Sequence, residues 1–183
     1  MRYAYTRRAV EVPPSKRTEN LLAACGLALA ERVREASEEA AGLGVGAPAA
    51  LVSISGFLDG QNVSALARVL GLSHPGAVRL VDRLERDGLI ERRRVSSDAR
   101  ELSLVATRAG RAAARRILAR RGAAMAEVLA ALSAEETEQL NGLLERLLGT
   151  MPADRHAGRR ICRLCDTGAC GHPDTCPVTL ATH

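Results

Sequence analysis

The spacing of hydrophobic positions between residues 62 and 107 changes once, near Gly88. Before that glycine, apolar residues recur three or four positions apart, which is the period of one helical face. The first such set is Val63, Leu66, Ala67 and Leu70, and the second is Ala77, Leu80, Val81 and Leu84. After Gly88, Leu102, Leu104 and Ala106 alternate with more polar residues, which is the period of a strand. The pattern predicts two short helices and then two strands.

Capping residues mark the ends of the two predicted helices. Asn62 is a suitable N-cap for the first helix. Gly71 suits its end, because glycine tolerates the left-handed conformation found there. Ser73 is the expected cap of the second helix, and Pro75 fits its first turn. Two apolar-striped helices joined by a turn of about three residues predict a helix-turn-helix.

A basic hairpin is predicted to follow. Arg92, Arg93 and Arg94 end its first strand, and residues 96–99 form a cluster typical of a turn. A helix-turn-helix with such a hairpin is a winged helix, so the fold class is mainly α with a small β-wing (α+β). The second helix would place its N-terminal residues against base edges in the major groove.

These residues resemble the multiple-antibiotic-resistance regulator (MarR) family of winged-helix transcription factors. The matching positions are Leu66-Ala67, Leu70-Gly71, Ser73, Val81 to Glu85, Gly88 to Ile90, Arg92, Asp98-x-Arg100 and the strand that runs to Thr107. The resemblance extends over about residues 17–149. It implies a homodimer that binds double-stranded DNA at a near-palindromic operator, more often as a repressor, and that leaves DNA when a small-molecule effector binds.

The residues expected to contact DNA lie on the second helix and the hairpin. They are Ser73, His74, Gly76, Arg79, Arg83, Arg92, Arg93, Arg94, Asp98 and Arg100. Ser73 and His74 stand at a helix start, where free amides and the helix dipole attract phosphate. The resemblance implies that Arg100 enters the minor groove and that Asp98 orients it. The competing interpretation is an ordinary cap, together with solvated arginines and an exposed turn ion pair.

Long helical patterns flank the winged helix on both sides. They run from Ser15 to about Gly42, from Pro48 to about Leu58, from Thr107 to about Leu132, and from the capping box Ser133-x-x-Glu136 to Gly149. The last helix carries an apolar seam of Leu140, Leu143, Leu144, Leu147 and Leu148. One chain of this length cannot cover so many apolar faces, so a twofold dimer that shares the outer helices is expected.

The resulting organisation has five regions. Residues 1–15 form a flexible N-terminal arm, 16–60 form N-terminal helices for dimerisation and support, 61–107 form the winged helix-turn-helix, 108–149 form C-terminal dimerisation helices, and 150–183 form a Cys-rich tail with a possible metal site.

Composition and net charge restrict the class of binding partner that we expect. The chain has 183 residues, a formal net charge of +5 and a sequence pI of about 9.3, and Lys16 is its one lysine. A basic balance suggests a polyanionic partner such as DNA. No signal peptide and no apolar run long enough for a bilayer are recognisable. We therefore expect a cytoplasmic protein without a membrane partner.

The tail contains four cysteines in 15 residues, spaced Cys162-x2-Cys165-x4-Cys170-x5-Cys176, with His172 among them. In a reducing compartment such clusters more often bind metal or act in redox chemistry than form structural disulfides. Four soft ligands suit tetrahedral Zn²⁺, either as four thiolates or as three thiolates and the His172 imidazole. An iron–sulfur cluster and a thiol–disulfide switch are the alternatives. The tail thus adds metal or redox state as a second expected signal that sets the affinity for DNA.

Cys25 lies on the apolar stripe of the first helix and is interpreted as a small packed hydrophobic residue. Redox sensing, as in a hydroperoxide-sensing branch of the family, is its alternative role. For the whole chain, the alternatives are a small metal- or thiol-dependent oxidoreductase and a protein-binding winged helix. No catalytic triad, glycine-rich phosphate loop or carboxylate pair is recognisable, and four thiolates would leave a metal no open position. We therefore expect no enzyme activity.

Overall fold

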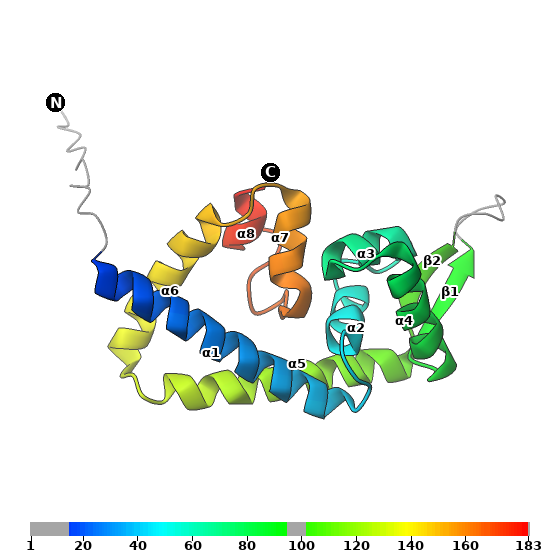
Figure 1. The fold of residues 1–183 in the computed structure, drawn as a ribbon, viewed down its shortest axis with the longest axis horizontal. Coiled ribbons are helices and arrows are strands. Elements are labelled where there is room, and N and C mark those ends of the chain that lie inside the picture. Colours follow the sequence, from blue (N-terminus) through cyan, green and yellow to red (C-terminus); the bar gives the residue numbers. More distant parts are fainter. Residues whose placement is uncertain (1–14, 95–101, 183) are drawn as a thin grey trace.

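The computed structural model describes residues 15–94 and 102–182 (Figure 1). Its elements, in chain order, are α1 (Lys16–Ala41), α2 (Ala47–Ser55), α3 (Val63–Leu70), α4 (His74–Arg86), β1 (Ile90–Arg94), β2 (Leu102–Ala106), α5 (Arg108–Leu129), α6 (Ala134–Thr150), α7 (Arg155–Ile161), the 3-10 turn η1 (Cys162–Leu164) and α8 (Pro177–Leu180). The predicted fold class, mainly helical with one small β-wing, is confirmed.

The core of the molecule lies inside the winged helix. It is formed by α2, α3, α4, the hairpin and the first half of α5. Its fully buried side chains include Leu51, Ile54, Leu66, Leu84 and Ile117. The predicted caps are present, because Asn62 Oδ1 accepts from the Ala65 amide at 3.0 Å and Ser73 Oγ accepts from the Gly76 amide at 3.3 Å.

The wing is joined tightly to α5. Strands β1 and β2 pair antiparallel, with Ile90 opposite Ala106 and Arg94 opposite Leu102. Thr107 caps α5 by accepting from the Gly110 amide at 3.0 Å, and its hydroxyl donates to the Gly88 carbonyl at 2.7 Å. A Cβ built on Gly110 would lie 1.9 Å from the Leu89 carbonyl oxygen. Position 110 therefore requires glycine for the close approach of α5 to the base of the wing.

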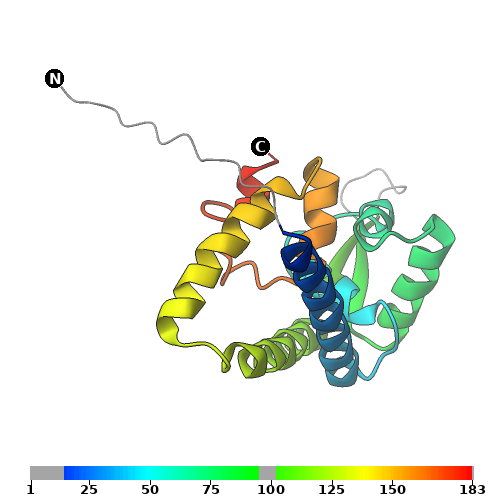
Figure 2. The ribbon, with the colours of Figure 1, turned by 60° about the vertical axis from the view of Figure 1, so that its left-hand side comes forward.

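The outer helices form an open frame. Helix α1 lies along α5, and α6 rises from the far end of α5, away from the winged helix (Figures 1 and 2). Helix α6 has no buried residue in the part of the chain that the structure describes. Large apolar side chains are exposed on both outer helices, namely Leu21, Leu22, Leu27, Leu143, Leu144 and Leu147. One chain alone thus leaves the predicted seam uncovered.

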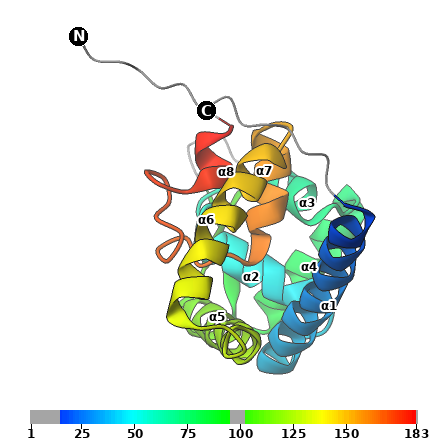
Figure 3. The same ribbon diagram turned by 90° about the vertical axis from the view of Figure 1, so that its left-hand side faces the viewer.

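The tail is folded back onto the body. Helix α7 packs on α3, η1 packs on α2, and α8 packs on α6 (Figure 3). The buried Ser53 hydroxyl of α2 donates to the Arg163 carbonyl at 3.1 Å. None of the helices in the described ranges is long and apolar enough to cross a membrane.

Candidate nucleic-acid interface and cysteine-lined pocket

The start of α4 is built as an exposed helix N-terminus. Ser73 and His74 are both exposed, and His74 Nδ1 lies 3.4 Å from Ser64 Oγ of α3. Gly76 gives its amide to the Ser73 cap. The remaining first-turn amides and the positive end of the helix dipole suit a phosphate group.

The two arginines expected to read DNA from α4 have different surroundings. Arg79 is exposed on the face opposite the buried stripe. Arg83 is half-buried, and its Nη2 donates to the Val45 carbonyl at 3.4 Å. Its Nε atom is buried without a hydrogen-bond partner. Of these two arginines, Arg79 is therefore the one whose side chain is more available to a ligand, whereas Arg83 also links α4 to the segment before α2.

The three wing arginines also have different surroundings. Arg92 is paired with two carboxylates of α4, Asp82 at 2.6 Å and Glu85. Burial would lower the pKa of Arg92, but hydrogen bonds and charge from Asp82 and Glu85 outweigh it and raise that pKa. This ion-pair group fixes the wing on α4. Arg93 is exposed beside Glu91, and Arg94 is exposed at the end of β1. Asp98 and Arg100 lie outside the described residues.

Helix α4 and the β1–β2 wing lie beside each other at one end of the molecule (Figure 1). They present the exposed cations Arg79, Arg86, Arg93 and Arg94 together with the free amides of the α4 start. Guanidinium groups bind phosphate and guanine edges with the same planar pair of donors. The arrangement can therefore hold a duplex with a helix on its bases and a hairpin on its backbone.

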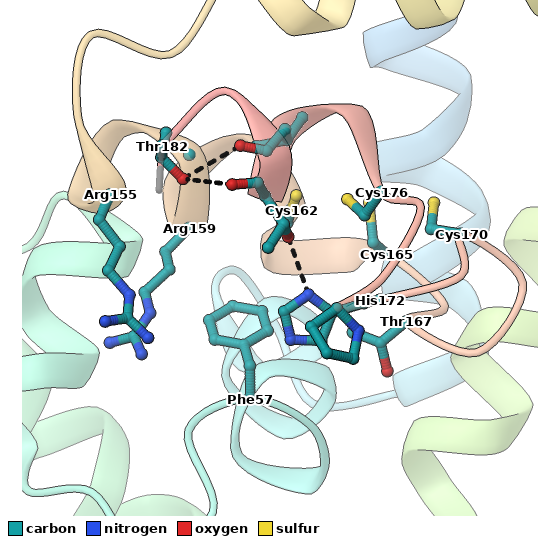
Figure 4. A pocket seen from close by; sticks show the side chains of 14 residues that line it. Phe57, Arg155, Arg159, Cys162, Cys165, Thr167, Cys170, His172, Cys176 and Thr182 are labelled. Atoms are coloured by element: carbon teal, nitrogen blue, oxygen red, sulfur yellow. Dashed lines mark hydrogen bonds between the residues drawn. The ribbon is translucent and has the colours of Figure 1, made fainter.

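The four tail cysteines line a single pocket of about 310 Å³ (Figure 4). Cys162 and Cys165 come from the η1 turn, Cys170 from the following loop, and Cys176 from the N-cap of α8. Cys176 is 3% exposed. His172 lies on the same wall, and its Nδ1 is 2.8 Å from Thr179 Oγ1. The structure thus brings together all five tail residues that the sequence singles out.

The thiols influence one another. A hydrogen bond from Cys162 lowers the pKa of Cys165 to about 6, against burial, and the positive charge of Arg121 acts in the same direction. The same hydrogen bond, together with burial, raises the pKa of Cys162. Burial and the neighbouring thiols Cys165 and Cys176 raise the pKa of Cys170. These shifts identify Cys165 as the thiol most readily ionised.

The thiols are not arranged as a complete metal-coordination sphere. Over residues 15–94 and 102–182, no three His, Cys, Asp or Glu side chains are placed to hold a metal ion. Each of the five cysteines is present as a free thiol. Cys25 is exposed on α1 in the single chain. Its packing as a small hydrophobic residue stays a prediction, because the stripe that carries it is expected to face a second copy.

The opposite wall of the pocket was not predicted from the sequence. Arg155 and Arg159 of α7 face Phe57, and the Arg159 guanidinium lies 5.9 Å from the centre of the Phe57 ring. Burial and the charges of Arg155 and Arg68 lower the pKa of Arg159. The missed signal is Asp154, which caps α7 by accepting from the Ala157 amide at 2.8 Å. Recognised as an N-cap, it would have predicted a helix that carries these arginines.

Comparison with known proteins agrees with this geometry. The sequence model of the MarR family matches residues 41–101, which include α2, α3, α4 and β1. The chain is also similar to the solved YusO protein of Bacillus subtilis, with 25% identity and a TM-score of 0.60. That match covers 72% of this chain and 92% of YusO.

Two further solved structures carry small molecules. The MarR family protein RV2887 of Mycobacterium tuberculosis, in complex with salicylic acid, has 29% identity and a TM-score of 0.57 over 76% of this chain and 99% of its own. CouR of Rhodococcus jostii, bound to p-coumaroyl-CoA, has 28% identity and a TM-score of 0.51 over 69% of this chain and 88% of its own. Each is matched over most of its length, whereas about a quarter of this chain lies outside the matches.

Proposed function

Because this chain belongs to the MarR family of winged-helix transcription regulators, we propose that it is a homodimeric repressor that binds a near-palindromic DNA operator. The observation that carries the proposal is the exposed start and outer face of α4 beside an arginine-bearing wing. Family members are transcription regulators, so the oxidoreductase alternative is set aside.

The dimer is supported by the apolar residues that one chain leaves exposed. Leu21, Leu22 and Leu27 of α1 and Leu143, Leu144 and Leu147 of α6 are exposed on the outer frame. A second copy that covers them would bury apolar surface at about 25 cal/mol per Å². A twofold arrangement would also present two α4 helices to successive major grooves, about one helical turn apart.

The releasing signal that we propose is a small aromatic or other anionic molecule. Two solved relatives are described with salicylic acid and p-coumaroyl-CoA. In this chain a smaller pocket of about 150 Å³ lies between α2, α5 and the tail loop. Val52, Leu118, Arg111 and Arg115 line it, together with Asp166 of the tail. The apolar side chains suit a ring and the two arginines suit a carboxylate.

The proposal is tested by titrating the full chain against the duplex upstream of its own coding region. Arg79→Ala should weaken binding by about 1–3 kcal/mol, roughly 5- to 150-fold in Kd, because it removes a contact at the α4 surface. Arg116→Ala is the matched control, since Arg116 is exposed on α5, away from α4 and the wing. It should leave Kd within about twofold and the salt dependence unchanged.

Two outcomes would contradict parts of the proposal. Equal losses from Arg79→Ala and Arg116→Ala would mean that binding follows net charge alone, which removes α4 as the reading element. Salicylate added to the same titration is expected to raise Kd in the parent chain and to do so less in Arg115→Ala. No response to salicylate in either protein would exclude this class of aromatic acid as the signal.

A further inference from the structure

We propose that Cys162, Cys165, Cys170 and Cys176 bind one Zn²⁺ ion, and that this ion fixes the fold of the C-terminal tail, which packs against helices α2 and α3. The inference goes beyond the proposed function, since it concerns the tail and requires no DNA. Its first ground is convergence: four thiols from three consecutive segments line one pocket (Figure 4).

The four thiols share one pocket, but within the described residues they are not yet placed around a common point. In a tetrahedral site with zinc–sulfur bonds of about 2.3 Å, neighbouring sulfur atoms lie about 3.8 Å apart. An iron–sulfur cluster places its own iron and sulfide atoms between the thiolates and keeps them farther apart. A single zinc ion therefore needs less room between the four cysteines of this pocket than a cluster would.

The backbone around the thiols is fixed by local hydrogen bonds. The Cys165 amide donates to the Cys162 carbonyl at 2.9 Å, which closes the tight Cys-x2-Cys turn. The Cys170 amide donates to the Asp166 carbonyl at 3.1 Å, and Asp166 Oδ1 accepts from the Gly168 amide at 3.1 Å. Zinc binding then needs rotation of the cysteine side chains toward a common point and no refolding of the loop.

The charge around the pocket suits a thiolate set. Four thiolates and Zn²⁺ carry a net charge of about −2. Arg121 of α5 faces Cys165 and donates to the Leu164 carbonyl, and Arg159 lies on the pocket wall. His172 Nδ1 lies 2.8 Å from Thr179 Oγ1, so only its Nε2 could take the place of a thiolate. We assign the four thiolates as the set. A closed set of four without a water position is typical of a structural zinc site.

The tail packs on the body but has almost no hydrophobic core of its own. Within its described residues, Cys176 and Val178 are the only buried hydrophobic side chains. Its contacts with the body include the partly buried Leu164 against the core, Ser53 with the Arg163 carbonyl, and Arg160, whose Nη2 would lie 3.1 Å from a Cβ at Gly71 at the end of α3. A segment with so small a core is ordinarily stabilised by metal or disulfides. Zinc would thereby fold the tail segment that packs on the helix-turn-helix.

The first test measures metal in the full chain, purified anaerobically under reducing conditions and dialysed against a chelator. About one zinc ion per chain is expected by elemental analysis. Cys165→Ser should lose most of it, whereas Cys25→Ser, which removes a thiol on α1, should retain it. Iron with visible absorption would overturn the zinc assignment in favour of a cluster. Absence of metal, with either free thiols or an internal disulfide, would also overturn it.

The second test asks whether zinc holds the tail. Amide hydrogen exchange is compared between zinc-loaded protein and protein stripped of zinc under reducing conditions. Residues 155–180 should exchange at least about tenfold faster after stripping, while α4 and α5 remain protected. Bound zinc without any change in the tail would overturn the holding role. Both tests are done without DNA, so failure of zinc binding and failure of DNA binding are distinguishable.

Discussion

Leucine side chains are buried in the winged helix of this chain but remain largely exposed on its outer helices. In the winged helix, Leu51, Leu66 and Leu84 are essentially fully buried by neighbours from the same chain. On the frame, Leu27 of α1 is 76% exposed and α6 buries nothing in the described structure. The difference indicates that the winged helix is stabilised within one chain, whereas the frame is stabilised by association.

The distinction has a thermodynamic consequence. Stability that comes from packing inside a chain does not depend on protein concentration, whereas stability that comes from a partner does. Substitutions in the winged helix should therefore change stability equally at every protein concentration. Substitutions on the outer helices should have effects that depend on protein concentration.

The largest expected effect comes from exchanging a core leucine. Leu84→Ala should lower the free energy of unfolding by about 2–5 kcal/mol, because it leaves a cavity among fully buried side chains. Leu147→Ala on α6, where the side chain is 39% exposed, is the matched variant. It should mainly shift the monomer–dimer equilibrium. Chemical denaturation at several protein concentrations, with sedimentation equilibrium, measures both.

Two results would remove the distinction between the regions. If Leu147→Ala proved as costly as Leu84→Ala at every concentration, α6 would be part of the chain's own core. If the parent chain remained monomeric at high concentration, the exposed leucines would have no partner of their own kind.

The features predictable from the sequence are those that depend on neighbours along the chain. Asn62, Ser73, Thr107 and Ser133 all cap helices as expected, because a cap satisfies amides only two or three residues away. The period of two after Gly88 likewise identified β2. These signals depend only on residues nearby in the chain, so tertiary packing leaves them unchanged here.

Features that depend on distant partners were less accessible. The sequence treats Arg92, Arg93 and Arg94 alike, but Arg92 alone is paired with Asp82 and Glu85 of α4. Similarly, Arg83 contacts the Val45 carbonyl, 38 positions earlier in the chain. Convergence of the tail cysteines was predictable from spacing, whereas the packing of α7 on α3 was not. These contacts follow from how elements pack, which no local pattern contains.

The next effect concerns the junction between the two regions, where α5 leaves the winged helix. Gly110→Ala should cost about 1–3 kcal/mol, because the new methyl group would overlap the Leu89 carbonyl and force the wing away from α5. Gly122→Ala on the same helix meets nothing within 4 Å and should stabilise the protein by about 0.5–1 kcal/mol. Thermal unfolding compares them, and equal shifts would show that helix propensity alone acts at both sites.

The smallest expected effect tests whether the capping box stabilises α6, which has no buried residue of its own in the described part of the chain. Ser133→Ala should cost about 1 kcal/mol and Ser133→Gly only a few tenths, because the capping box supplies amide partners at the start of α6.

The same box gives α6 a pH dependence. The backbone hydrogen bond from Ser133, followed by its side-chain bond, lowers the pKa of Glu136. A lowered pKa in the folded state means that this contribution is complete above the usual glutamate range, near about 4.3, and is lost as pH falls through the folded value. Amide exchange in α6 should therefore accelerate in acid more in the parent chain than in Glu136→Gln. Identical acid responses in both proteins would mean that burial against a partner, and not the box, maintains this helix.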